Sequence, residues 1–186
     1  MKNKYFLLRH GQALSNVKEI ISSWPEKGRF PLTEKGRKDI KERAQELKDK
    51  NIDFIFSSDL LRTKQTAEIV SEKTRVNPFF DKRLREYNVG IFNGKPEIDY
   101  RKHMEGKNRF KESSQGGETY NQIAERVFDL FKELEEKYSD KNILIISHQV
   151  PLTLLEAQAK GVSFEGMRSS GDLKDKLLGG EKIKTG

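Results

Sequence analysis

The sequence predicts an α/β fold, a three-layer α/β/α sandwich with a mostly parallel central sheet. Two observations predict it. Four short apolar segments of strand length are spread along the chain, at residues 5–8, 52–57, 77–80 and 142–147. Between them lie longer, charge-rich segments whose apolar residues recur at helical spacing. We expect a single domain over residues 1–186, because a chain of this length builds one core.

The first predicted strand, residues 5–8, ends abruptly in Arg9, His10 and Gly11. Residues 12–21 have a mixed character that indicates a short helix or turn, followed by a loop. Ligands of open α/β sheets bind at the carboxyl ends of the strands. The position of Arg9 and His10 therefore makes them candidate binding residues.

The next helix is predicted over residues 34–50, because Ile40, Ala44 and Leu47 recur at helical spacing and Thr33 is a favourable N-cap. The strand at residues 52–57 then leads into a third helix, predicted over residues 61–74. Either Ser58 or Asp59 is expected to cap that helix, and residues 77–80 follow it as a short third strand.

Residues 81–117 form the least regular part of the chain and are rich in glycine. Such a segment is too long for a passive connection, so we expect a functional loop or lid with short helices that shapes the substrate region. Thr119 and Gln122 then fit a capping box. The helix that they open carries a regular apolar stripe: Ile123, Val127, Leu130, Phe131 and Leu134.

The most apolar strand, residues 142–147, is predicted to be central in the sheet. It ends in Ser147, His148 and Gln149, and a helix is expected over residues 150–160. Residues 161–186 are poor in apolar side chains and form a tail to which the pattern assigns no structure.

Composition narrows the class of partner. The net charge is +7, but Lys and Arg are spread among Glu and Asp without a dense basic block, which favours solvated helix faces and no nucleic-acid partner. No apolar stretch reaches the length of a membrane span, so no membrane partner is expected. The absence of cysteine excludes disulfides and thiolate metal sites. We expect a cytoplasmic protein, with a homodimer as an alternative to a monomer.

Two histidines occupy the same topological place. His10 and His148 each follow an apolar strand, and Arg62 begins the helix after the second strand. Because parallel strands end on the same side of a sheet, these side chains and Arg9 are expected to converge. Two guanidinium groups, which match phosphate oxygens bidentately, and two imidazoles predict a phosphoryl pocket. A histidine in such a pocket indicates nucleophilic catalysis through a phosphohistidine.

The leaving alkoxide then needs a proton, and Glu86 is the candidate donor. Its pKa must be raised by burial or by the phosphate charge for this role at neutral pH. Gly11, which has no side chain, would let the ligand approach the backbone closely. The third histidine, His103, lies in the irregular region and is not assigned to the site.

Five ordered motifs across residues 5–148 resemble those of the histidine phosphatase superfamily, the phosphoglycerate-mutase-like proteins. They are Arg9-His10-Gly11 with Asn16, the segment from Ser57 to Ala67, the segment from Leu84 to Gly94, Gly116-Gly117-Glu118-Thr119, and Ile146-Ser147-His148.

This resemblance implies a phosphoglycerate-mutase-like fold, with His10 as nucleophile and Glu86 as proton donor. It places Asn16 near the phosphate or the substrate, and it implies neither a metal nor a cofactor. The phosphate pocket that it implies consists of Arg9, Arg62 and His148.

The chain departs from the family pattern in three places. Ala13 replaces a serine or threonine and removes one hydroxyl near the phosphate. Gln149 replaces a glycine; its N–H would still serve the substrate, but a positive φ there would be strained. After Lys160 no final strand of the family kind is evident.

The activity that we favour is a metal-independent phosphatase acting on phosphate monoesters of small metabolites through a phosphohistidine at His10. The short chain favours it over phosphoglycerate-mutase-type phosphoryl transfer. Glu86 argues against a dedicated protein-phosphohistidine phosphatase, because a phosphoramidate leaving group needs less help from an acid. A catalytically silent phosphate-binding or adaptor module remains an alternative of another class.

Overall fold

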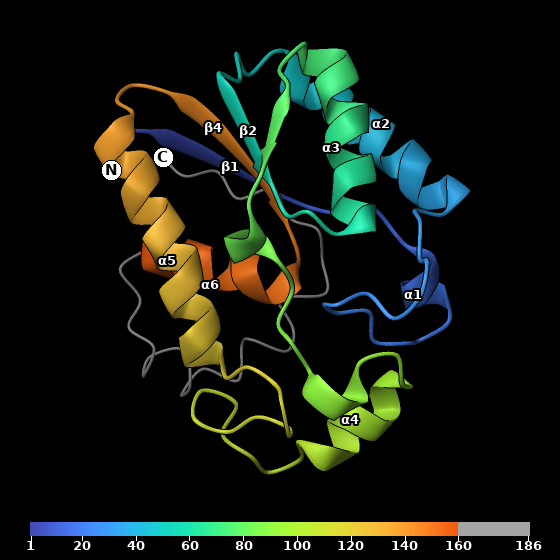
Figure 1. The fold of residues 1–186 in the computed structure, drawn as a ribbon. Coiled ribbons are helices and arrows are strands. Elements are labelled where there is room, and N and C mark those ends of the chain that lie inside the picture. The colour runs from blue at the N-terminus through green and yellow to red at the C-terminus, as the bar shows by residue number, and fades with distance from the viewer. Residues whose placement is uncertain (160–186) are drawn as a thin grey trace.

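The computed structural model describes residues 1–159. Its centre is a sheet of four parallel strands in the order β1 (Lys4–Arg9), β4 (Asn142–Ser147), β2 (Phe54–Ser57) and β3 (Pro78–Phe80) (Figure 1). The predicted parallel sheet is confirmed, and β4 lies between two other strands as its apolar sequence indicated.

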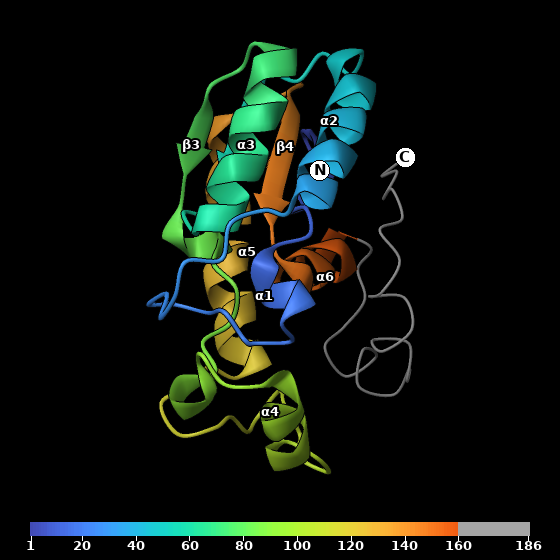
Figure 2. The same ribbon diagram turned by 90° about the vertical axis from the view of Figure 1, so that its right-hand side faces the viewer.

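Two helix layers cover the sheet (Figures 1 and 2). Helices α2 (Glu34–Lys48) and α3 (Leu61–Thr74) pack together on one face, and α5 (Tyr120–Lys137) and α6 (Gln149–Ala159) pack on the other. The predicted three-layer sandwich is therefore confirmed. Within residues 1–159 no helix has the length and apolarity needed to cross a membrane.

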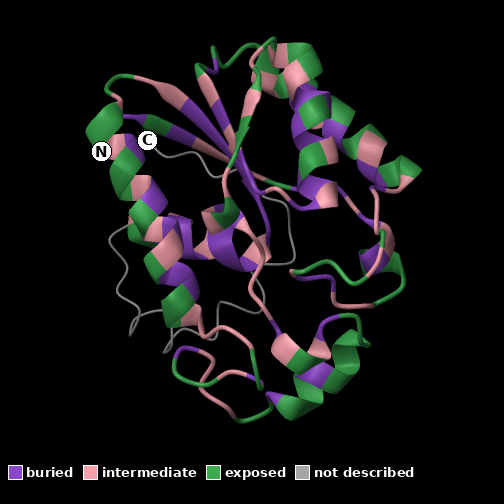
Figure 3. Cartoon of the chain, in the orientation of Figure 1, coloured by how far each residue is buried: buried purple, intermediate pink, exposed green. Residues whose placement is uncertain are grey.

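Strand β4 supplies the core on both sides of the sheet. Ile143 and Ile145 contribute to the cluster that includes α5 and α6, while Leu144 and Ile146 contribute to the cluster that includes α2 and α3. Side chains alternate between faces along a strand, so a strand covered on both faces must be apolar at every position. Figure 3 shows buried residues along the strands and on the inward sides of the helices.

The caps predicted for the N-termini of α2 and α5 are confirmed. Thr33 Oγ1 accepts a hydrogen bond from Gly36 N–H at 3.0 Å, as expected of an N-cap. The capping box of Thr119 and Gln122 at the start of α5 is also confirmed.

The expected cap of α3 is wrong. The N-cap residue is Leu60, and its side chain makes no cap hydrogen bond. The Asp59 carboxylate instead pairs with Arg85 at 2.6 Å, and Ser58 Oγ accepts the N–H of Leu60, which precedes the helix, at 3.4 Å. The Glu26 carboxylate, from a loop far away in the sequence, caps the helix instead. Its Oε2 accepts a hydrogen bond from Leu61 N–H at 3.1 Å.

Several predicted boundaries shift by one or two residues. Strand β2 begins at Phe54 and helix α2 ends at Lys48, whereas α3 spans the predicted range. Residue 160 of the predicted last helix and the tail at residues 161–186 lie outside the described residues.

The irregular region contains short helical pieces, as the sequence indicated. These are two 3₁₀ turns, Lys82–Leu84 and Gly90–Phe92, and helix α4 (Glu97–His103). Val89, Tyr100 and Met104 form its own small core. The region lies beyond the carboxyl ends of the strands, close to the short helix α1 (Leu14–Val17) (Figure 2). Its role as a lid stays a prediction.

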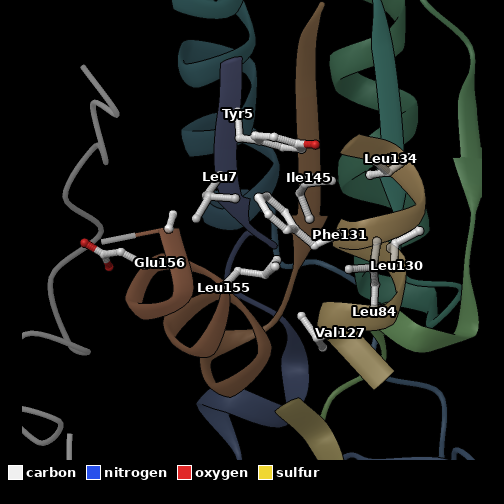
Figure 4. A pocket seen from close by; sticks show the side chains of 11 residues that line it. Tyr5, Leu7, Leu84, Val127, Leu130, Phe131, Leu134, Ile145, Leu155 and Glu156 are labelled. Atoms are coloured by element: carbon white, nitrogen blue, oxygen red, sulfur yellow. The ribbon is translucent and has the colours of Figure 1, made fainter. Parts of the chain in front are cut away.

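A small apolar cavity of about 20 Å³ lies between β1, α5 and α6 (Figure 4). Tyr5, Leu7, Phe131 and Leu155 are among the residues that line it. It has room for about one water molecule, and none of the predicted phosphate-pocket residues lines it. It is a packing defect of the core and not a binding site for a metabolite.

The two-sided role of β4 can be tested by replacing Leu144, which is fully buried, with alanine. Leu144→Ala should lower the free energy of unfolding by about 2–5 kcal/mol, because a buried cavity replaces the side chain. Ile98→Ala, at a position that is 54% exposed, should change it by less than about 1 kcal/mol. Chemical denaturation measures both; equal losses would contradict this account of the core.

Candidate active site

The site is assembled at the carboxyl ends of β1 and β4. These strands pair in register up to Arg9 and Ser147, so His10 and His148 leave the sheet side by side, with ring centroids 5.1 Å apart. Arg62, in the first turn of α3, lies against both rings. Its Nε is 3.0 Å from His10 Nε2, and its Nη2 is 3.0 Å from His148 Nδ1.

These contacts decide which ring nitrogens carry protons. A guanidinium group only donates hydrogen bonds, so His10 Nε2 and His148 Nδ1 must be acceptors. The proton of His10 then lies on Nδ1, which donates to Gly11 O at 2.8 Å. The proton of His148 lies on Nε2, which donates to Ser58 Oγ at 2.9 Å. Both imidazoles are neutral in this network, and each presents one lone pair to Arg62.

The electrostatics agree with this assignment. Burial lowers the pKa of His10 well below its usual value, and the positive charges of Arg62 and Arg9 lower it further. Burial likewise lowers the pKa of His148 well below its usual value, with Arg62 adding to the effect. An unprotonated imidazole beside fixed cations is therefore the resting state at neutral pH.

Arg62 is only 3% exposed, and its guanidinium is held by groups that sequence reasoning missed. Nη1 donates to Ser22 Oγ at 3.2 Å, and Nη2 donates to Ser22 O at 3.0 Å. The Glu26 carboxylate lies 3.7 Å from Nη1. A buried cation is costly unless it is hydrogen-bonded and paired. Ser22 and Glu26 lie in a loop without regular structure, so no periodic pattern singled them out.

Arg9 is the last residue of β1 and remains exposed to solvent. Glu86 and Glu97 both lie near enough to act electrostatically on its guanidinium. Arg9 therefore supplies a solvent-exposed positive charge to the site, whereas the charge of Arg62 is buried.

Glu86 lies close to the two arginines, which both lower its pKa. Burial is the larger effect and raises the pKa above the usual value for a glutamate. Its Oε1 accepts a hydrogen bond from Tyr87 N–H at 3.1 Å. The pKa of Glu86 is therefore shifted in the direction that a proton donor at neutral pH requires.

Arg126 of α5 holds the backbone around Glu86. Its Nη1 donates to Arg83 O at 2.5 Å and its Nη2 to Glu86 O at 3.4 Å. Glu118 pairs with Arg126 at 3.0 Å and also accepts Asn88 N–H at 2.8 Å. These two side chains thus clamp the segment that carries the acid. Glu118 lies in the Gly116-Gly117-Glu118-Thr119 motif, to which the family resemblance by itself assigns no role.

Two further contacts fix the same segment. Ser147 Oγ, at the end of β4, donates to Leu84 O at 2.6 Å. Arg85 pairs with Asp59, which follows β2, at 2.6 Å. The acid's loop is therefore tied to the end of β4, which carries His148, and to the segment between β2 and α3, which leads to Arg62.

The remaining predicted residues have local partners. Asn16 Oδ1 accepts a hydrogen bond from Ala13 N–H at 2.9 Å. Gly11 N–H donates to Thr66 Oγ1 at 3.3 Å, and a Cβ on Gly11 would come within 2.6 Å of Gly36 O. Close packing against α2 therefore requires a glycine at position 11, apart from any ligand.

Gln149 is the first residue of α6, and it is not among the non-glycine residues with positive φ. The strain considered for this replacement of glycine is therefore absent. Ala13 is fully buried and forms an isolated antiparallel bridge with Leu32, so its methyl group fills space in the core. Within residues 1–159 no group of three or more His, Cys, Asp or Glu side chains could hold a metal ion.

Comparison with known proteins gives a consistent picture. The family model described as "Histidine phosphatase superfamily (branch 1)" matches residues 5–172. Phosphoserine phosphatase 1 of Hydrogenobacter thermophilus is 28% identical over 182 residues, covering 90% of this chain and 81% of that protein. A Salmonella choleraesuis protein named "Probable phosphoglycerate mutase GpmB" is 28% identical over 163 residues, covering 84% of this chain and 74% of that one.

Among solved structures, a mycobacterial glucosyl-3-phosphoglycerate phosphatase complexed with VO3 has a similar fold. The TM-score is 0.77 at 25% sequence identity, over 86% of this chain and 83% of that chain.

The pocket should bind a phosphate-like oxyanion, and orthovanadate is a suitable probe. Arg9→Gln should weaken vanadate binding about 10- to 100-fold, because one charge-assisted hydrogen bond is worth about 1.5–3 kcal/mol. Arg43→Gln, at a half-exposed position on α2, is the matched control. Isothermal titration measures the dissociation constants, and an unchanged value for Arg9→Gln would remove Arg9 from the pocket.

Proposed function

This chain belongs to the histidine phosphatase superfamily, and from that premise we propose that it hydrolyses phosphate monoesters of small metabolites without a metal, through a phosphohistidine at His10. The observation that carries the proposal is the contact of one buried guanidinium, that of Arg62, with both neutral imidazoles. That arrangement leaves a nucleophilic lone pair directly beside a fixed positive charge.

The first step begins with an exchange of hydrogen bonds. In the free site the lone pair of His10 Nε2 accepts the Arg62 Nε–H. An incoming phosphoryl group takes over this donor with one of its oxygens, which frees the lone pair to attack phosphorus. The N–P bond forms as the P–O bond to the leaving group breaks. Arg9 and Arg62 stabilise the negative charge on the equatorial oxygens.

His148 completes the cradle. Its Nδ1 accepts from Arg62 in the free site, and its Nε2–H is engaged by Ser58. When Arg62 turns toward the phosphoryl oxygens, His148 can take up a proton and become a second cation beside them. Its fixed position, at the end of the central strand, keeps the ring within reach of the same oxygens.

Glu86 supplies the proton that the leaving oxygen needs. Its pKa is raised by burial, which makes it a better proton donor at neutral pH than an exposed glutamate. In the second step a water molecule attacks the phosphohistidine, the N–P bond breaks, and Glu86 takes a proton from that water. Inorganic phosphate leaves, and His10 and Glu86 return to their starting forms.

Relatives with phosphatase names among the curated proteins and the solved structures support hydrolysis of a phosphate ester. One curated relative is a phosphoserine phosphatase and one structural neighbour is a glucosyl-3-phosphoglycerate phosphatase. The relative named as a phosphoglycerate mutase keeps phosphoryl transfer between two sites of one substrate as the second candidate. A catalytically silent adaptor is less well supported, since a neutral nucleophile, two arginines and a raised-pKa acid are all present.

Replacement of the nucleophile tests the proposal directly. His10→Ala should lower the turnover of p-nitrophenyl phosphate at least about 1,000-fold, because it removes the Nε2 atom that accepts the phosphoryl group. His103→Ala, which removes an exposed histidine in α4, should retain the wild-type rate. Phosphate release at the wild-type rate in His10→Ala would overturn the mechanism.

The acid role predicts a dependence on leaving group and on pH. Glu86→Gln should slow alkyl phosphates about 100-fold or more and p-nitrophenyl phosphate much less. With alkyl phosphates the wild-type rate should rise with pH through the lowered pKa of His10, as the imidazole becomes neutral. It should fall again through the raised pKa of Glu86, as the acid is lost. Glu86→Gln should remove this upper limb; equal losses on both substrates would exclude the acid role.

A further inference from the structure

The irregular region is joined to the loop after α1 by backbone hydrogen bonds. Gly94 N–H donates to Ile21 O, and Ile21 N–H donates to Lys95 O, both at 2.9 Å. Glu97 N–H donates to Glu19 O at 2.8 Å. The irregular region therefore lies directly beside the loop that holds the buried guanidinium of the site (Figure 2).

One buried side chain, that of Asn93, connects the irregular region to the next part of this loop. Asn93 follows the 3₁₀ turn Gly90–Phe92 and is only 4% exposed. Its Oδ1 accepts a hydrogen bond from Ser23 N–H at 3.0 Å, and its Nδ2 donates to Pro25 O at 2.8 Å. An asparagine amide can do both, because it carries an acceptor and two donors. Asn93 therefore fixes the backbone on both sides of Trp24.

The side chain of Ser23 adds a second connection. Ser23 is fully buried, and its Oγ donates to Tyr87 O at 2.7 Å. Tyr87 directly follows Glu86, the proposed acid. The loop is therefore held both by Asn93 and by the segment that carries the acid.

The residues that anchor Arg62 lie on either side of the segment at residues 23–25. Ser22 precedes this segment and accepts hydrogen bonds from both Nη1 and Nη2 of Arg62. Glu26 follows it, lies 3.7 Å from Nη1 and caps α3. Residues 22–26 form no helix or strand, so no regular hydrogen-bond pattern of their own fixes them. The anchors of Arg62 therefore depend on Asn93 for their position.

We propose that Asn93 is a positioning residue for the phosphate pocket, because it holds the loop that fixes the guanidinium of Arg62. The inference rests on the proposed phosphatase activity and adds to it a residue outside the pocket. In that mechanism Arg62 exchanges its hydrogen bond with His10 for one with a phosphoryl oxygen. Donors that are already held in position bind an oxyanion more tightly, because less ordering is needed when the ligand arrives.

The affinity for orthovanadate tests this role. Asn93→Ala removes both amide hydrogen bonds and should raise the dissociation constant about 3- to 10-fold, less than the loss of a whole charge-assisted hydrogen bond. Ser114→Ala is the matched control, because Ser114 is also buried and its Oγ donates to Val89 O within the irregular region. It should keep the wild-type dissociation constant in titration calorimetry.

The position of Arg62 can also be measured by NMR without any ligand. The Arg62 Nε–H is buried and donates to His10, so its signal should exchange slowly with solvent in the wild-type protein. Absence of the signal in Arg62→Lys identifies it. Asn93→Ala should speed this exchange at least about 10-fold, because the guanidinium loses its anchors. Ser114→Ala should not, although it also removes a buried hydrogen bond.

Ser23→Ala provides a milder second variant, because it removes one hydroxyl and leaves Asn93 in place. It should raise the dissociation constant of vanadate about 2- to 5-fold. Equal vanadate dissociation constants in Asn93→Ala and Ser114→Ala, or an unchanged exchange rate of Arg62 Nε–H in Asn93→Ala, would refute the positioning role. Where Asn93→Ala does not fold, an unchanged dissociation constant in Ser23→Ala refutes it instead.

Turnover of p-nitrophenyl phosphate separates this inference from the function on which it rests. Its absence in the wild-type protein refutes the phosphatase proposal itself. The exchange rate of Arg62 Nε–H does not depend on turnover, so it still decides whether Asn93 positions the guanidinium.

Discussion

The buried guanidinium of Arg62 is the interaction on which the site depends. It enters from the first turn of α3 and joins His10, at the end of β1, to His148, at the end of β4. Because it can only donate, it sets the tautomers of both rings and keeps each of them neutral. Ser22 and Glu26 compensate the burial of its charge. One side chain thus couples the strand ends, the loop after α1 and the protonation state of the proposed nucleophile.

The second constraint on the site is the position of the Glu86 carboxyl group near this cation. Glu86 must keep a proton while lying close to two arginines that favour its charged form, and its burial outweighs them. Such a balance requires a fixed position, since a carboxylate free to move into solvent would ionise. Arg126 and Glu118 supply that fixation from outside the sheet, and Ser147 ties the same segment to the end of β4.

The α/β sandwich and the irregular region at residues 81–117 contribute different groups to the site. The α/β sandwich positions the phosphate chemistry with strand ends and a helix start, which packing on both faces makes rigid. The region at residues 81–117 contributes the acid, and it packs around a small core of its own. In the proposed function the sandwich therefore handles the phosphoryl group common to all substrates, and the irregular region meets the part that differs between them.

The sequence by itself determined the layers, the parallel sheet and the place of each motif, because apolar periodicity and cap residues such as Thr33 are local signals. It also predicted that His10, Arg62 and His148 would meet, since parallel strands end at one edge. Only the tertiary structure decided that Asp59 pairs with Arg85 while Glu26 caps α3, and that Ser22 holds Arg62. The physical reason is that these contacts involve loops far apart along the chain. A loop sequence has no helical or strand periodicity from which its contacts could be predicted.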